Sequence, residues 1–267
     1  ETELARMGEG SLAGSIITND NDIARELVLG TAAYHGRMLV VNRHCADEST
    51  GHGSPLPHLV HGGPGRAGGG EEMGGVRGIK HYMQRTAIQG SPETLSVIGH
   101  RWIRGADEKD PGAHPFRKTF EQLEIGDSLR SELREVTLED INHFAEFTGD
   151  TFYAHMDEEA AASNPFFDGR VAHGYLIVSF AAGMFVDPDF GPVLANYGID
   201  DLRFITPLNH GDSMRVRLTC KQKTLRGDTG YGEVRWDTEI TNQDDEIVAQ
   251  YDVLTMVATD AHWASVQ

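Results

Sequence analysis

The sequence predicts an α+β fold in which one long apolar helix is wrapped by a curved antiparallel sheet, with a shorter α/β segment before it. Residues Gly174–Val186 are apolar on every side, which is typical of a helix enclosed by protein. The pattern that follows changes to period two over several segments, as expected for strands of an antiparallel sheet. The chain before residue 98 instead has the order strand, helix, strand.

Composition restricts the class of protein. The 267 residues are 39% hydrophobic, which is sufficient for a packed core, and the formal net charge is -18. A charge of this sign disfavours nucleic acids and anionic membrane surfaces as partners, and no segment has the roughly 18 apolar residues that span a bilayer. Cys45 and Cys220 lack metal-ligand spacing and indicate a reducing, cytoplasmic compartment. Because the first residue is Glu1, we expect the natural chain to begin further upstream.

Residues 1–98 form the first predicted domain, residues 99–117 a linker and residues 118–267 the second domain. The first domain is rich in small residues, and its stretch 61–78, close to half glycine, is predicted to be a loop. Its ordered part is expected to contain a strand ending at Ser15–Thr18, a helix over Asp20–Leu29 and a buried strand over Arg37–Asn42. Aspartate, proline and glycine give residues 100–117 the composition of a linker.

The second domain is predicted to begin with a strand over Ser128–Val136 and an amphipathic helix over Thr137–Thr148. Thr137 is the expected N-cap, and Gly149 suits the end of that helix. Four further strands follow the apolar helix, the last two joined by a turn over 242–245, and they are predicted at Asp201–Ile205, Ser213–Thr224, Gly232–Thr241 and Glu246–Val257. One buried helix wrapped by such a sheet is the hot-dog arrangement.

Asp150 and His155 are the candidate catalytic side chains, and the backbone of Gly174 is the candidate third component. A neutral imidazole accepts a proton near pH 7, and a carboxylate five residues away can orient it or share the transfer. A backbone N–H at the start of a buried helix directs a fixed dipole at a developing oxyanion. Taken singly, Asp150 is better explained as a helix-terminal turn residue and His155 as a loop residue. Their combination with the His173-Gly174 pair favours catalysis, with His173 itself structural.

The spacing Asp150-x4-His155, followed by Val171-Ala172-His173-Gly174, resembles the signature of the (R)-specific enoyl-CoA hydratase, or MaoC-like, family. The resemblance implies that Asp150 and His155 deprotonate a water that adds to an unsaturated acyl-CoA, while the N–H of Gly174 polarises the thioester carbonyl. Some members place a serine hydroxyl two turns along the buried helix. This chain has alanines at 181 and 182 there, with Ser179 nearby.

Four basic residues alternate along one predicted strand and are therefore expected to share a face, which could bind the phosphates of coenzyme A. The alternative is pairing with acidic residues of the next strand on a solvated face, which explains the same pattern without a ligand. The four residues are Arg215, Arg217, Lys221 and Lys223.

A literal GxGxxG occurs at Gly63–Gly68, but it lacks the preceding strand and following helix of a dinucleotide site, and no GK[ST] follows. Arg37–Asn42 with the later glycine-rich run, through Gly74-Gly75-Val76-Arg77, instead resembles the C-terminal end of an aldehyde dehydrogenase catalytic domain. The resemblance implies that the nucleophile and the cofactor-binding part precede this chain. Cys45 is accordingly interpreted as a buried small residue.

The whole chain, which combines these two resemblances, is similar to the bifunctional ring-opening proteins of bacterial phenylacetate degradation. The run from Val41 to Pro57 carries much of this similarity. That similarity implies that the chain opens the ring of oxepin-CoA, a CoA thioester, by hydrolysis and that it forms a homo-oligomer. It also implies that NADP binds only to the full-length parent and that this chain holds no cofactor or metal. Two alternatives remain: a general (R)-specific enoyl-CoA hydratase, and a non-catalytic hot-dog module for acyl-CoA binding or assembly.

Overall fold

The computed structural model describes residues 1–49, 51, 79, 83 and 85–267. These residues form two compact units, Glu1–Asp107 and Glu108–Gln267, each described by itself below. The predicted linker 99–117 is divided between the two units. The GxGxxG run at 63–68 lies outside the described residues.

The first unit is built on a parallel sheet with strand order β1-β2-β3. The predicted strand, helix and strand are confirmed as β1, α2 and β2, and the side chain of Asp20 caps α2 by accepting hydrogen bonds from two backbone N–H groups. A small apolar core between the sheet and the helices includes Val28, Met38 and Val40. The elements of this unit are α1 (Thr2–Met7), β1 (Ser11–Ile17), α2 (Asn21–Thr31), η1 (Ala32–Tyr34), β2 (His35–Val41), β3 (Ala87–Gln89) and α4 (Pro92–Gly99).

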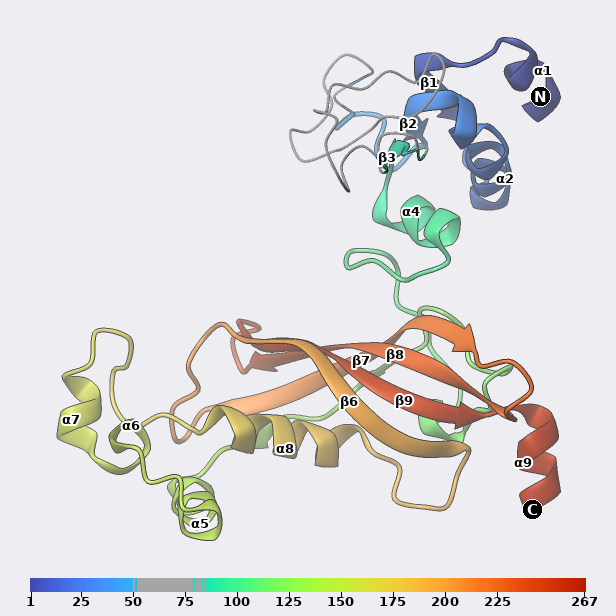
Figure 1. Ribbon diagram of the computed structural model, residues 1–267. Coiled ribbons are helices and arrows are strands. Elements are labelled where there is room, and N and C mark those ends of the chain that lie inside the picture. The colour runs from blue at the N-terminus through green and yellow to red at the C-terminus, as the bar shows by residue number, and fades with distance from the viewer. Residues whose placement is uncertain (50, 52–78, 80–82, 84) are drawn as a thin grey trace. The chain divides into compact units, whose positions relative to one another are not determined.

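The second unit is an antiparallel sheet with one long helix, α8, lying along one of its faces (Figure 1). The strand order is β4-β7-β8-β9-β6, and β5 also pairs with β7. Three shorter helices, α5 to α7, lie beyond the N-terminal end of α8 (Figure 1). The elements are η3 (Pro115–Arg117), β4 (Ser128–Arg130), β5 (Arg134–Glu135), α5 (Leu138–Thr148), α6 (Tyr153–Met156), α7 (Glu158–Ala162), α8 (Gly174–Phe185), β6 (Val193–Phe204), β7 (Ser213–Leu225), β8 (Tyr231–Asn242), β9 (Ile247–Ala258) and α9 (Asp260–Val266).

The core of this unit lies between α8 and the sheet. Alternate residues of the strands point toward the helix, so a strand such as β8 contributes Val234, Trp236 and Ile240, each at most 1% exposed. The buried face of α8 packs on them through residues that include Leu176 and Phe185. This confirms the predicted hot-dog arrangement of one helix wrapped by an antiparallel sheet.

Two predicted strands differ from those in the structure. The strand expected over Ser128–Val136 is split into β4 and β5, because the Ser131 hydroxyl accepts the N–H of Val216 at 3.0 Å and takes over one ladder position. Strand β6 begins at Val193, eight residues earlier than the predicted start. The prediction depended on alternation of apolar and polar residues, which the first residues of β6 do not show. Most residues of this strand are exposed, and burial does not alternate at its start either.

Helix α8 is enclosed on one side only within this chain. Leu176, Ile177 and Ala181 are buried, whereas Tyr175 and Ser179, one turn apart, face solvent. The expectation that protein surrounds this helix on every side is therefore wrong for the single chain. Among the residues that the structure describes, no helix combines the length and the apolarity needed to cross a membrane.

Candidate active site

Asp150 follows helix α5 and lies near the N-terminal end of α8. Thr137 and Asp140 form a capping box at the start of α5, with the Thr137 hydroxyl accepting the N–H of Asp140 and the Asp140 carboxylate accepting the N–H of Thr137. Gly149 ends the helix with φ 79°, in the left-handed region that favours glycine. The chain turns there, and Asp150 follows directly.

His155 lies on the single turn α6, and its ring is held by a backbone carbonyl. Its Nδ1 lies 2.8 Å from the carbonyl oxygen of Val171, which can only accept, so Nδ1 carries the hydrogen and Nε2 presents a lone pair. The guanidinium of Arg170 donates to the His155 carbonyl at 2.5 Å and to the Asn142 side chain at 2.6 Å, which ties α6 to α5. The imidazole is thereby arranged as a base with a fixed direction.

His173 lies against both of these residues. Its Nε2 is 2.9 Å from the backbone carbonyl of Asp150, and its ring stacks on that of His155 with centroids 3.8 Å apart and planes inclined by 28°. Burial is the largest influence on this ring and lowers its pKa, so His173 is neutral at pH 7. Sequence reasoning expected a structural residue at this position.

Gly174 is the first residue of α8, so its N–H is one of the four helix-initial amides without an intrahelical acceptor. The ring of Phe204, from β6, lies directly over it: a Cβ at position 174 would be 2.5 Å from the nearest ring carbon. A larger residue at 174 would require this ring to move. The positive end of the helix dipole therefore lies beside an aromatic ring.

Asp150, His155 and His173 each offer an atom within 4.8 Å of the others. Such a group can serve a cation or acid–base chemistry. Each imidazole uses one nitrogen on a backbone carbonyl, and the two rings are nearly parallel, so their in-plane lone pairs do not converge on one point. This geometry favours proton transfer over metal ligation. The structure therefore brings together Asp150, His155 and Gly174 as predicted neighbours, and their catalytic roles remain a prediction.

Ser179 is the residue nearest to the serine position of the family pattern. Its hydroxyl donates to the carbonyl of Tyr175 at 2.7 Å, one turn back in the same helix, and the residue faces solvent. Ala181 is buried in the core. The hydroxyl at this point is thus engaged within the helix.

The four basic residues of β7 do not share one face. A β-bulge between Cys220 and Gln222 shifts the register, so Lys223 pairs with core-facing Val234 and lies over the ring of Phe120 at 4.7 Å. The prediction of a common face is therefore wrong for Lys223.

The other three basic residues make ion pairs within the chain. Arg215 pairs with Asp245, Arg217 with Asp237 and Lys221 with Asp252. Arg217 with Asp237 is the expected pairing with the next strand, whereas Asp245 lies in the turn after β8 and Asp252 lies on β9. Asp237 and Asp252 are buried, so the expectation of a solvated face is wrong for these pairs. Phosphate binding by the four residues stays an untested prediction.

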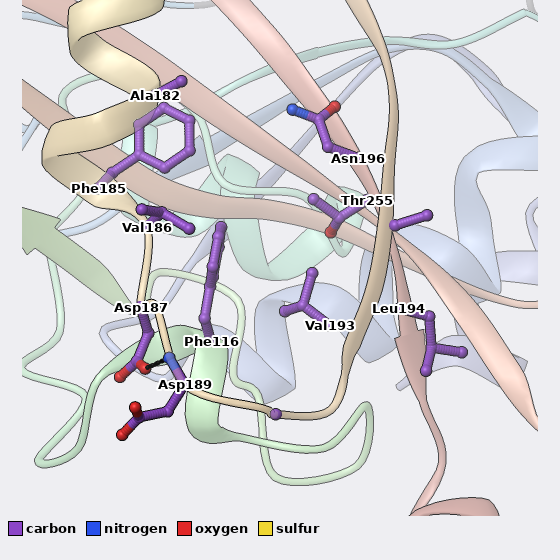
Figure 2. Close-up of a pocket in the computed structure, with 12 residues that line it drawn as sticks. Phe116, Ala182, Phe185, Val186, Asp187, Asp189, Val193, Leu194, Asn196 and Thr255 are labelled. Atoms are coloured by element: carbon purple, nitrogen blue, oxygen red, sulfur yellow. Dashed lines mark hydrogen bonds between the residues drawn. The ribbon is translucent and has the colours of Figure 1, made fainter.

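A cavity of about 240 Å³ lies at the opposite, C-terminal end of α8. Figure 2 shows Phe116 and Phe185 beside it, with the side chain of Asn196 on the strand β6. Arg117 pairs with Asp187 at 2.7 Å and with Asp189 at 2.5 Å in the loop at its edge. None of the predicted catalytic residues lines it. Sequence reasoning missed this cavity because its walls come from separate segments that share no motif.

Comparison with known proteins places these features in a family. Residues 120–242 match the model of the MaoC like domain. The chain is 57% identical over 223 residues to the protein called Protein MaoC of Klebsiella aerogenes, covering 84% of this chain and 66% of that protein. It is 34% identical over 109 residues to 3-hydroxyacyl-thioester dehydratase Z of Mycobacterium tuberculosis, covering 40% of this chain and 70% of that protein.

Two further similarities were found. A stretch of 61 residues is 44% identical to 3,4-dehydroadipyl-CoA semialdehyde dehydrogenase of Aromatoleum evansii, covering 23% of this chain and 12% of that protein. The solved structure of a monoamine oxidase regulatory protein from Archaeoglobus fulgius has a TM-score of 0.50 and 31% identity, covering 53% of this chain and 95% of the other. The chain spans about two thirds of the first relative and a small part of the dehydrogenase. The chain belongs to the MaoC-like family of hot-dog hydratases and dehydratases.

Proposed function

We propose that this chain adds water to an α,β-unsaturated acyl-CoA thioester, with Asp150, His155 and Gly174 as the reacting groups. The observation that carries the proposal is the placement of a carboxylate and an oriented imidazole beside the first N–H of α8. Membership of a family with dehydratases among its relatives supports the same reaction class.

In the proposed reaction, His155, Asp150 and the N–H of Gly174 have different roles. Nε2 of His155 holds the lone pair that takes a proton from the attacking water, and the Asp150 carboxylate holds the second hydrogen of that water. The hydroxide oxygen bonds to C3 of the acyl group, and the C2–C3 π electrons move toward the thioester carbonyl. The N–H of Gly174 donates to that oxygen while it is negatively charged. The proton taken by the pair then returns to C2, so one water is added across the double bond.

The finer substrate proposal is oxepin-CoA. Addition of water to this unsaturated ring ether breaks the ring C–O bond and gives an aldehyde, with the thioester carbonyl as electron sink. The similarity of part of the chain to an enzyme named as a CoA semialdehyde dehydrogenase supports a link to such an aldehyde.

On this proposal, residues 1–98 are the end of an aldehyde dehydrogenase domain whose full-length parent oxidises the aldehyde with NADP. Cys45 is half-buried and its thiol donates to the carbonyls of Val40 and Asn42 at 3.8 Å. A thiol engaged with its own strand end is compatible with a structural residue. We propose that this chain by itself has no dehydrogenase activity, that it is cytoplasmic and that it forms a homo-oligomer.

The test is hydration of crotonyl-CoA and of oxepin-CoA by the purified chain, followed as loss of enoyl absorbance and as aldehyde formation. Asp150→Asn and His155→Asn are each expected to lower kcat by roughly 10²–10⁴-fold, because each removes a proton-transfer group. Asp168→Asn and His143→Asn, exposed residues of the same types, are the matched controls and should retain the parent rate.

The outcomes separate the alternatives. Rapid hydration of crotonyl-CoA with no action on oxepin-CoA identifies a general enoyl-CoA hydratase. Full retention of the rate in both site variants rejects the assignment of Asp150 and His155. A chain that binds acyl-CoA and turns over neither substrate is the non-catalytic module.

A further inference from the structure

We propose that His173 is a positioning residue for the hydration reaction, one that holds Asp150, His155 and the start of α8 in a single arrangement. The inference rests on the proposed function and goes beyond it, since it assigns a role to a residue that the proton transfers do not use. It concerns two segments that are close in sequence, the loop after α5 and the turn α6, and one that follows later in the chain, the first residue of α8.

The contacts of His173 reach all three segments. Its Nε2 is 2.9 Å from the Asp150 carbonyl, its ring lies 3.8 Å from the ring of His155, and the next residue along the chain is Gly174. Phe144 of α5 packs on the ring with centroids 5.0 Å apart. The side chain is 1% exposed. Because His173 is buried and contacts each of these residues, its position helps to fix the positions of Asp150 and His155.

The hydrogen-bond pattern fixes the tautomer of this imidazole. A carbonyl oxygen can only accept, so Nε2 of His173 carries the hydrogen and Nδ1 carries a lone pair. That Nδ1 is buried and has no hydrogen-bond partner among the described residues. An unpartnered buried acceptor destabilises a fold, and an apolar ring in this place would avoid the cost. The imidazole is therefore explained by its donor to Asp150 and not by core packing.

The charge state fits the same role. The groups that act electrostatically on His173 are Asp150, His155 and Arg170. Burial lowers its pKa, and the neighbouring His155 and Arg170 act in the same direction, while Asp150 opposes them. His173 thus stays neutral while His155 gains a proton during turnover. A neutral stacked ring supports that imidazolium, whereas a second cation would repel it.

Two variants separate the donor from the ring. His173→Gln keeps an N–H donor near the position of Nε2 and removes the stacked ring, whereas His173→Phe keeps a stacked ring and removes the donor. We expect His173→Phe to lower kcat on crotonyl-CoA about 10- to 100-fold with KM changed less than about twofold, because the carboxylate and the base lose their mutual alignment. We expect His173→Gln to recover most of that loss.

A purely structural role predicts a different result. Both variants would then lose activity in proportion to a lower Tm, without rescue by glutamine. That result, or a folded His173→Phe protein with kcat within twofold of the parent, overturns the inference.

Long-range ¹H–¹⁵N NMR of the imidazole rings gives a second measurement that needs no activity. In the parent at pH 7, His173 should be neutral with its hydrogen on Nε2, and His155 should carry its hydrogen on Nδ1. A charged His173, or one with its hydrogen on Nδ1, contradicts the proposal. A parent that hydrates neither thioester overturns the proposed function instead, and the NMR result then shows whether the arrangement itself exists.

Discussion

At the scale of single residues, the close approach of Phe204 to Gly174 is the most restrictive feature of the site. The phenyl ring comes from β6, on the far edge of the sheet order, and covers the α-carbon of the first residue in α8. Any side chain at 174 would meet ring carbons at 2.5–2.8 Å, closer than a real Cβ contact. A side chain at 174 would therefore require the ring of Phe204 or the start of α8 to move.

Gly174→Ala keeps the backbone N–H, but its methyl group should displace either the Phe204 ring beside this amide or the start of α8 that carries it. We expect a loss of about 10²-fold in kcat/KM, the magnitude found when one oxyanion donor is removed. Enoyl-CoA hydration kinetics on the purified variant measure it. The double variant Gly174→Ala with Phe204→Ala makes space for the methyl group and should regain part of the rate relative to Gly174→Ala alone. Parent-like activity in the single alanine variant would contradict the assignment of this amide.

How much of the site the sequence could predict follows from where each residue lies. Asp150, His155 and Gly174 are linked by spacing along one stretch of chain, and the structure brings them together. Phe204 lies thirty residues further on and belongs to another element, so no local motif points to it. The sequence predicts a structural role for His173, because the catalytic role at this point is assigned to the backbone of its neighbour Gly174. The contacts of His173 with Asp150 and His155 depend on tertiary packing, so no local motif indicates them.

At the scale of elements, local signals predicted the two ends of α5, whereas they did not predict which face each residue of β7 occupies. Thr137 and Gly149 mark the ends of α5 through a cap and a left-handed residue, both of which depend on neighbours within four positions. Strand faces depend on pairing over longer distances. The bulge after Cys220 places Lys223 on the face of the sheet opposite to that of Arg217. A period-two pattern in the sequence does not indicate where such a bulge occurs.

The charge network on β7, β8 and β9 gives a prediction for these strands. Asp252 is 4% exposed in its side chain and pairs with Lys221 at 2.6 Å and Arg235 at 2.9 Å. Asp252→Asn leaves two cations near a neutral group, and we expect the free energy of unfolding to fall by about 3 kcal/mol. Urea denaturation measures the change.

The matched control is Glu124→Gln, which breaks an exposed pair with Lys109 and should cost at most about 1 kcal/mol. Equal losses in the two variants would show that the buried network contributes no more than a surface pair. In that case the interpretation of the basic residues as structural partners of the acidic ones loses its support, and phosphate binding becomes the better explanation.

At the scale of the whole molecule, the second unit leaves apolar surface uncovered. Strand β6 lies at one edge of the sheet order and is hydrogen-bonded to β9 alone among the described strands. Leu194, Tyr197 and Ile199 on this strand are each more than two fifths exposed, and Tyr175 on α8 is 68% exposed. A long, apolar sheet edge is a surface to which another strand adds readily. This surface supports the proposed homo-oligomer, with a second copy of the chain covering β6.

The oligomeric state can be tested by changing that edge. Light scattering coupled to size-exclusion chromatography should give at least twice the 29.3 kDa of the single chain. Ile199→Asp should shift the mass toward that of a monomer, because a charge on the edge opposes burial against a second strand. Leu225→Asp, at an exposed residue ending β7, is the control and should leave the mass unchanged. A parent that elutes as a monomer would contradict the homo-oligomer. An Ile199→Asp protein whose mass equals that of an oligomeric parent would place the contact between copies elsewhere than β6. In either case the exposed surface of β6 would need another explanation.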